Sequence, residues 1–455
     1  MYLTAILTRY RIKKGIGCQS FYYFTDGLVI KGIPLKRFSF FIAVFSLLCS
    51  AVAHASLLNI RSESVDAEAW TVLDSQTGQV ITEHNADIKR APASLTKMMV
   101  AYIALKEIKA GKLQKSEILT ATPIVKTVMW DESQMYLKEG EQISVDQLLA
   151  GLIVMSANDA AVTLAEKISG NLPAFIQRMN SEAQALGMTN THFQNPAGIT
   201  MPEHYSTAND LAKLSQALVN QTPDYLYYSK QQSFSYNQHF HRATNLLLKI
   251  DPTVDGLKTG FTRAAGYNLA STALRPQPFN QSSRRLIVVV LGAKNALQRA
   301  EISHKLMNLS YAYTRNETAI QEKSVLAELP VLKSTLKMFR IETSQPTIVT
   351  TSLYNQNSEI DLNQFNNQTQ RIEALNDAQL PISIEPLTET NTRLNVELQQ
   401  SNLTAPLESV MKLATVQIYQ NDHLIRSVDI ENEVRIEEAS LLQRFMMWLS
   451  NLLPF

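Results

Sequence analysis

The chain has 455 residues, and 42 Lys and Arg against 41 Asp and Glu leave a formal charge of +1. Its 45% hydrophobic and 18% charged fractions are those of a globular protein, which excludes a disordered or collagen-like chain. The near-neutral balance argues against nucleic-acid binding, and the 15 glycines include no glycine-rich phosphate motif.

The N-terminal segment has the pattern of an export signal. Lys36-Arg37 precedes the apolar run 38–49, and Ala53-His-Ala55 follows with small residues around a larger one. This pattern predicts a signal peptide with a long leader over residues 1–55, cleaved after Ala55. The alternative is an uncleaved anchoring helix, for which the run is short.

Cysteine usage agrees with export. Cys18 and Cys49 both precede the predicted cut, so the mature chain would contain no cysteine, disulfide or thiolate nucleophile. Export without disulfides is compatible with a bacterial periplasm or cell surface.

Residues 56–320 mix helical and strand patterns and are predicted to form one α+β domain, with helices packed on an antiparallel sheet. Strands are predicted at 70–74, 79–82, 267–273 and 285–291, and helices at 92–105 and 148–155. Ser144-Val-Asp-Gln147 is a capping-box pattern that would start the second helix.

Residues 321–432 read as a small all-β domain. Strands are predicted at 346–350 and 394–398, and a hairpin joins 416–419 to 424–428 through Gln420-Asn-Asp-His423. Residues 433–455 follow as an amphipathic helix whose apolar residues share one stripe, which is typical of a helix lying on a membrane surface. The alternative is that this stripe packs on the protein itself or on a partner.

Three short motifs carry the chemistry: Ser94-Leu-Thr-Lys97, Ser156-Ala-Asn158 and Lys258-Thr-Gly260. Each alone is weak, because the chain also contains Ser334-Thr-Leu-Lys337 and Ser235-Tyr-Asn237. The information lies in their order, spacing and setting.

The first motif describes an activated nucleophile. Ser94 stands where a helix begins, and Lys97 is one turn later, so amine and hydroxyl share a face. A desolvated lysine near another cation has a lowered pKa and acts as a base. The structural alternative is that Ser94 is only an N-cap.

The other two motifs suit a peptide-like substrate. Ser156 follows a buried helix, and the Asn158 carboxamide both donates and accepts hydrogen bonds. Lys258-Thr259 precedes the predicted strand pair 267–273 and 285–291, Lys258 supplies a cation for a carboxylate, and Gly260 permits close backbone approach. The alternatives are a turn between helices for Ser156-Ala-Asn158 and a solvated strand end for Lys258-Thr259.

In this order, the three motifs resemble those of penicillin-binding proteins and serine β-lactamases. The runs around them are similar to the D-alanyl-D-alanine carboxypeptidases of the penicillin-binding protein 5 and 6 type, strongly over residues 65–310 and weakly beyond. They are Ala93-Ser-Leu-Thr-Lys-Met-Met99, Ser156-Ala-Asn-Asp-Ala160, Asn190-Thr-His-Phe193, Val254-Asp-Gly-Leu-Lys-Thr-Gly260 and Ala265-Gly-Tyr-Asn268. The resemblance implies that fold, with a small C-terminal β domain.

The resemblance also implies roles for the motif residues. Ser94 would be acylated by the peptidoglycan stem peptide and by β-lactam antibiotics, with Lys97 as base and Ser156 as proton relay. Asn158 would hold the substrate amide, and Lys258 and Thr259 the terminal carboxylate. Beside Gly260, the backbone N–H groups of Ser94 and Phe261 would form the oxyanion hole. No cofactor or metal is implied.

Two positions depart from the family pattern. Phe261 stands where penicillin-binding protein 5 has a histidine, and Thr244-Asn245 replaces an Arg-Asn pair, with Arg242 nearby. We therefore assign no carboxylate-binding arginine from the sequence.

Other functions stay open or are disfavoured. A DD-endopeptidase would use the same residues, and a slow peptidoglycan-binding scaffold would retain them. A β-lactamase would need a deacylating Glu-x-x-Leu-Asn run, which is absent from the sequence. The His239-x-His241 pair lacks a third ligand nearby, so a polar hairpin is the better interpretation than a metal site.

Overall fold

The structure is a computed structural model that describes residues 24–25, 28–29, 56–277, 282–353, 359–364 and 392–452. The chain divides into two units, Met1–Ala53 and His54–Phe455. In the first unit, β1 (Phe24–Thr25) and β2 (Leu28–Val29) form an antiparallel pair. The predicted apolar run at 38–49 and the cleavage site after Ala55 lie outside the described residues.

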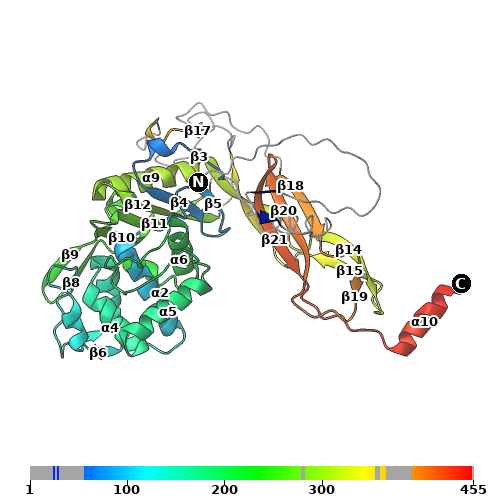
Figure 1. Cartoon of the computed structure of the whole chain (residues 1–455), viewed down its shortest axis with the longest axis horizontal. Helices are drawn as coiled ribbons and strands as arrows, with labels where there is room; N and C mark the ends of the chain where they lie inside the picture. The colour runs from blue at the N-terminus through cyan, green and yellow to red at the C-terminus, as the bar shows by residue number, and fades with distance from the viewer. Residues whose placement is uncertain are drawn as a thin grey trace. The chain divides into compact units, whose positions relative to one another are not determined.

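A five-stranded antiparallel sheet organises the second unit (Figure 1). Its strand order is β10 (Val254–Thr262), β11 (Gly266–Pro276), β12 (Ser283–Ala293), β4 (Ala69–Asp74) and β5 (Val80–His84). The strands predicted at 70–74, 79–82, 267–273 and 285–291 are confirmed. Each predicted end lies within three residues of the observed end.

Helices cover both faces of this sheet. Trp70 and Val72 point into a core shared with α9 (Ala296–Tyr313), whereas Ala69 and Leu73 belong to the opposite core, with α2 (Lys97–Lys109) and α6 (Ala208–Gln221). Successive residues of a strand face opposite sides, so every residue of β4 is buried. The predicted α+β class, helices on an antiparallel sheet, is confirmed.

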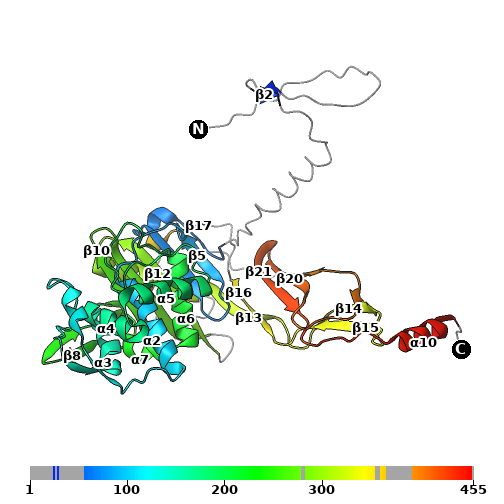
Figure 2. The ribbon, with the colours of Figure 1, turned by 60° about the horizontal axis from the view of Figure 1, so that its bottom comes forward.

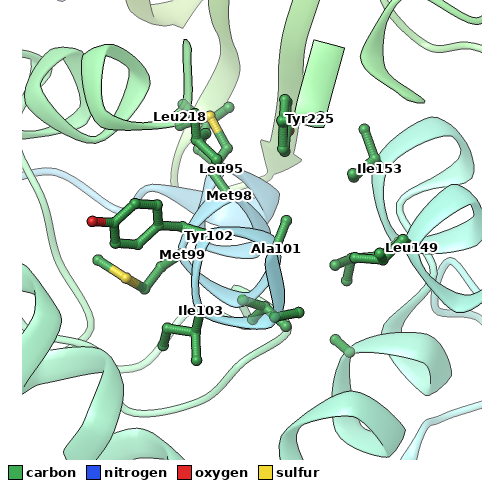
Figure 3. Close-up of a cluster of buried hydrophobic side chains, with 14 of the residues drawn as sticks. Leu95, Met98, Met99, Ala101, Tyr102, Ile103, Leu149, Ile153, Leu218 and Tyr225 are labelled. Carbon is green, nitrogen blue, oxygen red and sulfur yellow. The ribbon is translucent and has the colours of Figure 1, made fainter. Parts of the chain in front are cut away.

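Helix α2 lies at the centre of the core that contains Ala69 and Leu73 (Figure 3). Leu149 and Ile153 pack on one side of it, and Leu218 and Tyr225 come from other elements. The capping box predicted at Ser144 is present and starts α3 (Val145–Ala150), which continues as a π-helical turn η4 (Gly151–Met155). The second unit also contains the helices α4 (Asn158–Ser169), α5 (Leu172–Ala185), α7 (Tyr225–Ser229) and α8 (Leu247–Ile250).

Short elements connect these helices and strands. The antiparallel pairs are β6 (Ile118–Thr120) with β7 (Gln142–Ser144) and β8 (Ser233–Tyr236) with β9 (His239–Arg242), and β3 (Asn59–Ile60) pairs in parallel with β17 (Glu359–Ile360). The 3-10 turns are η1 (Ser62–Ser64), η2 (Ala93–Thr96), η3 (Pro123–Thr127) and η5 (Leu362–Gln364).

The C-terminal residues form a second group of strands (Figure 2). They are β13 (Thr314–Ile320), β14 (Val325–Leu332), β15 (Met338–Glu342), β16 (Thr347–Ser352), β18 (Thr392–Leu398), β19 (Leu403–Thr404), β20 (Lys412–Gln420) and β21 (His423–Glu431). The predicted hairpin is confirmed, because β20 and β21 pair antiparallel down to Gln420 and His423.

The last described element is the helix α10 (Leu441–Leu452). It starts later than the predicted residue 433, because Ser440 and Gln443 form reciprocal capping hydrogen bonds at its first turn. Among the described residues, no helix is both long and apolar enough to cross a membrane.

Candidate active site

Ser94 and Lys97 lie together where α2 begins. Ser94 belongs to the 3-10 turn η2, and Lys97 is the first residue of α2. The Lys97 Nζ donates to Ser94 Oγ at 3.0 Å and to the Ala197 carbonyl at 2.6 Å. Lys97 is buried whereas Ser94 is partly exposed, so the hydroxyl is open to an incoming ligand and the amine behind it is not.

The backbone around Ser94 is crowded and strained. Ala93 adopts a left-handed φ of 50°, an uncommon conformation for a residue with a side chain. A Cβ on Gly260 would lie 3.1 Å from the Ser94 nitrogen, and one on Gly198, at φ +86°, would overlap the Ala93 carbonyl. Glycine is therefore required at both positions for two other segments to approach the nucleophile's backbone.

Burial changes the electrostatics of both lysines in the site. Loss of hydration lowers the pKa of Lys97 to about 7, although the carboxylates of Glu132 and Asp159 act to raise it. Burial, with repulsion from Lys97 and Arg299, holds the pKa of Lys258 well below its usual range. A substantial share of Lys97 is therefore neutral at neutral pH, as a general base requires.

Ser156 and Asn158 stand at the junction between η4 and α4. Ser156 has a left-handed φ of 65° that ends the π-helical turn, and Asn158 is the first residue of α4. Both side chains are buried. Within the described residues, Ser156 Oγ and Asn158 Oδ1 have no hydrogen-bond partner, whereas Asn158 Nδ2 donates to Glu132 Oε2 at 2.5 Å.

The third motif lies inside an edge strand. Lys258-Thr259 precedes the strand pair β11 and β12, as predicted, but residues 258–261 themselves belong to a further strand, β10, which the sequence did not predict. Ladder pairing with β11 fixes them and packs β10 against η2, so Gly260 comes next to Ser94. Lys258 Nζ donates to the Thr259 carbonyl at 2.9 Å. Phe261 is half exposed and stacks on Tyr267, with ring centroids 4.3 Å apart.

Arg299 is a site residue that sequence analysis missed. Its buried guanidinium donates to the carbonyls of Gly260 at 3.1 Å and Asn268 at 3.3 Å, and so braces β10 from the side of α9. It also donates to the carbonyl of Thr244, whose hydroxyl is hydrogen-bonded to that of Thr259. Arg299 lies 39 residues from Gly260 in an ordinary helical sequence, so no local signal marks it.

Glu132 is the second missed residue. It lies in the loop before β7, outside any motif, and only the fold brings it to Asn158, 26 residues away. The structure also places the residues around the departing Thr244-Asn245 pair. Arg242 is exposed on β9, and the Thr244 hydroxyl contacts that of Thr259.

Among the described residues, neither duplicate motif forms a hydrogen bond to a residue of the three motifs. Ser334 accepts a hydrogen bond from Leu336 N in the turn after β14, and Lys337 is exposed. Ser235-Tyr-Asn237 lies in the hairpin of β8 and β9, which also carries His239 and His241 as predicted. Within the described ranges, no group of three or more His, Cys, Asp or Glu residues could hold a metal ion.

His204 has a structural role. Its Nε2 pairs with the Thr96 hydroxyl at 2.8 Å, and its Nδ1 accepts from Gln194 N at 2.9 Å. Burial lowers the pKa of His204 to about 4, so the ring is neutral near pH 7. Both ring nitrogens are therefore occupied in holding the loop around residues 194–204 against η2.

Known proteins are similar to this chain over the region that contains the three motifs. The D-alanyl-D-alanine carboxypeptidase family S11 matches residues 56–295. The chain is 38% identical to the D-alanyl-D-alanine carboxypeptidase DacC of Escherichia coli over 284 residues, which is 61% of this chain and 70% of DacC. It is 36% identical to DacA of the same organism over 303 residues, 64% of this chain and 74% of DacA.

Solved structures extend the likeness to the fold. Penicillin-binding protein 5 from Haemophilus influenzae superposes with a TM-score of 0.67 at 28% identity, covering 82% of this chain and 98% of that one. Penicillin-binding protein 6B from Escherichia coli gives a TM-score of 0.58 at 28% identity, covering 83% and 99%. With its fold, its SxxK, SxN and KTG motifs and these relatives, the chain belongs to the D-alanyl-D-alanine carboxypeptidases of family S11, which are serine-type carboxypeptidases.

Proposed function

We propose that the protein removes the terminal D-alanine from peptidoglycan stem pentapeptides through an ester intermediate on Ser94. The observation that carries this proposal is the 3.0 Å hydrogen bond between Lys97 Nζ and Ser94 Oγ, with Lys97 buried and its pKa lowered to about 7. A neutral Lys97 takes the Ser94 proton as Oγ attacks the penultimate D-alanine carbonyl. The peptide C–N bond then breaks, the leaving amine is protonated, and water hydrolyses the ester.

The remaining motif residues complete this proposal. Ser156 relays the proton to the leaving amine, which is supported by a buried hydroxyl that lacks a partner among the described residues. Asn158 binds the substrate amide through its unpartnered Oδ1. Lys258 and Thr259 bind the terminal carboxylate. The backbone N–H groups of Ser94 and Phe261 stabilise the oxyanion, supported by the close approach of Gly260 to Ser94.

Because a β-lactam also presents an acyl group and a carboxylate, we propose that β-lactams acylate the same Ser94. Intact-protein mass spectrometry with benzylpenicillin tests this proposal. We expect one drug-sized adduct on the wild-type chain and on Ser334→Ala, and none on Ser94→Ala. Ser334 is the matched control because it belongs to the other SxxK sequence.

The absence of an adduct from a folded wild-type protein would contradict the proposal and favour a peptidoglycan-binding scaffold. If the adduct forms, defined stem peptides separate the two hydrolytic functions. Release of D-alanine from a pentapeptide supports the carboxypeptidase, and preferential cleavage of a cross-linked dimer would make the protein an endopeptidase.

We further propose that the protein is exported and acts at the periplasmic face of the inner membrane, held there through α10. Support comes from the apolar residues of this helix, which are largely exposed instead of packed on the rest of the chain. They are Leu441, Leu442, Phe445, Met446, Trp448 and Leu449. An amphipathic helix with an exposed apolar stripe binds at a membrane interface through burial of that stripe.

A further inference from the structure

A carboxylate stands beside the three motifs without belonging to any of them. Glu132 Oε2 accepts a hydrogen bond from Asn158 Nδ2 at 2.5 Å. The side chain is half buried, and the polar side chains of the three motifs are all hydroxyls, amides or amines, so that Glu132 adds a carboxylate beside them.

The position of Glu132 is fixed by the start of α4. Asn158 N donates to the Ser133 carbonyl at 2.7 Å, next in the chain to Glu132. The buried carboxylate of Asp159 accepts from Met135 N and Leu137 N, each at 3.0 Å. The loop is thus clamped to α4 through backbone groups, so the contact between Glu132 and Asn158 is set by the fold and not by a freely moving side chain.

This contact decides which way the Asn158 carboxamide faces. An ionised carboxylate only accepts hydrogen bonds, so the amide nitrogen must face Glu132 and the amide oxygen must turn away from it. Within the described residues Oδ1 is buried and unpartnered. Oδ1 is therefore left to accept a hydrogen bond from a ligand, and the second N–H of Nδ2 remains available as a donor.

Glu132 also acts on the charge of Lys97. The groups that influence Lys97 are Glu132 from the loop and Asp159 from α4, which raise its pKa, and Lys258 from β10, which repels it. Glu132 and Asp159 thus favour the charged form of Lys97, whereas burial and Lys258 oppose it.

We infer that Glu132 is a positioning residue of the reaction, which holds the Asn158 carboxamide with its nitrogen toward Glu132 and its oxygen turned away, and which adds a negative charge near Lys97. This inference rests on the proposed function, because it assigns Asn158 and Lys97 the roles given above. A neutral glutamine keeps the hydrogen bond and removes the charge, whereas alanine removes both. The two effects are therefore separable.

The test measures the rate of Ser94 acylation by benzylpenicillin against pH for Glu132→Gln, Glu132→Ala and Asp131→Asn. Asp131→Asn is the matched control, because it removes the same charge from the exposed neighbouring position. We expect the acidic limb of the Glu132→Gln profile to move to lower pH by about half a unit or more, since Lys97 loses an attracting anion. The limb of Asp131→Asn stays at its wild-type position.

Glu132→Ala should show the same shift and, in addition, a plateau acylation rate about tenfold below that of Glu132→Gln, because the carboxamide is no longer oriented. The inference is overturned if the limb of Glu132→Gln coincides with that of Asp131→Asn, or if the two Glu132 variants share one plateau rate. Thermal unfolding shows whether each variant is folded. If Glu132→Ala fails to fold, the pH profile of Glu132→Gln against that of Asp131→Asn decides the test. A wild-type protein that forms no adduct would instead contradict the proposed function.

Discussion

At the scale of single residues, burial gives Lys97 its reactivity and also makes it costly to the fold. Its amine is enclosed, donates to Ser94 Oγ and the Ala197 carbonyl, and has a pKa lowered to about 7. The ordinary lysine pKa is about 10.4, so the folded protein releases a proton that the unfolded chain still holds between these two values. Stability therefore rises with pH across this window.

This linkage predicts the behaviour of Lys97→Met. Below about pH 7 Lys97 is protonated in both the folded and the unfolded wild-type chain, and the full cost of burying its charge is then present, on the order of 5 kcal/mol. The variant never carries that cost. We expect Lys97→Met to gain stability over the wild type at pH 6, and this advantage to shrink toward pH 10, while acylation of Ser94 is lost.

Urea unfolding at pH 6, 8 and 10 measures the effect. Lys337→Met serves as the control, because this exposed lysine holds the matching place in the second SxxK sequence. A difference between Lys97→Met and the wild type that does not change with pH would show that Lys97 keeps an ordinary affinity for protons in the fold.

At the scale of elements, α2 and α10 are both rich in apolar residues but meet different surroundings. Residues 97–105 of α2 are all buried, because the helices α4, α5, α6 and α7 pack around this part of the helix. Figure 3 shows buried side chains of this core. In α10 the exposed fraction is 58% for Trp448 and 80% for Leu441. The apolar surface of α2 stabilises the catalytic core, whereas that of α10 remains available for a membrane.

Trp448→Glu tests the membrane proposal for α10. Placing a charge in the apolar stripe should reduce binding to phospholipid vesicles about tenfold or more, because the indole no longer enters the interface and the carboxylate resists burial. Ser450→Glu is the control, because it adds the same charge outside the stripe. Vesicle sedimentation of the full chain measures both. Equal binding of the two variants would argue that α10 contacts something other than lipid.

At the scale of the whole second unit, hydrogen bonds join the C-terminal strands to the turn between β4 and β5. The Gln79 carboxamide accepts from Thr350 N at 2.7 Å and donates to the carbonyls of Thr350 and Ile425, each at 3.1 Å. The Thr77 and Thr350 hydroxyls are 2.7 Å apart. One glutamine thus satisfies backbone groups of both β16 and β21.

Gln79→Ala should therefore destabilise the chain by about 1–3 kcal/mol, because it leaves a backbone N–H and two carbonyls without this partner. The acylation rate of Ser94 should stay at its wild-type value, since Gln79 touches none of the motif residues. Thermal unfolding and the benzylpenicillin adduct measure the two quantities. A loss of acylation in the folded variant would mean that the C-terminal strands influence the active site.

The sequence determined the features that depend on neighbours in the chain. Alternating and continuous apolar runs located β4, β5, β11 and β12, and the capping box located α3, because strand and helix periodicity is a local property. The order of the three motifs was sufficient to indicate the family, and the turn residues 420–423 indicated the hairpin of β20 and β21.

Only the tertiary structure decided what depends on distant residues. Glu132 reaches Asn158 across 26 residues and Arg299 reaches Gly260 across 39, and no local pattern marks either one. Lys258-Thr259 precedes β11 and β12 as predicted, but only ladder pairing with β11 makes the motif itself part of a strand, β10. The lowered pKa of Lys97 likewise follows from complete burial, which is a property of the packed core and not of the helix that carries the lysine.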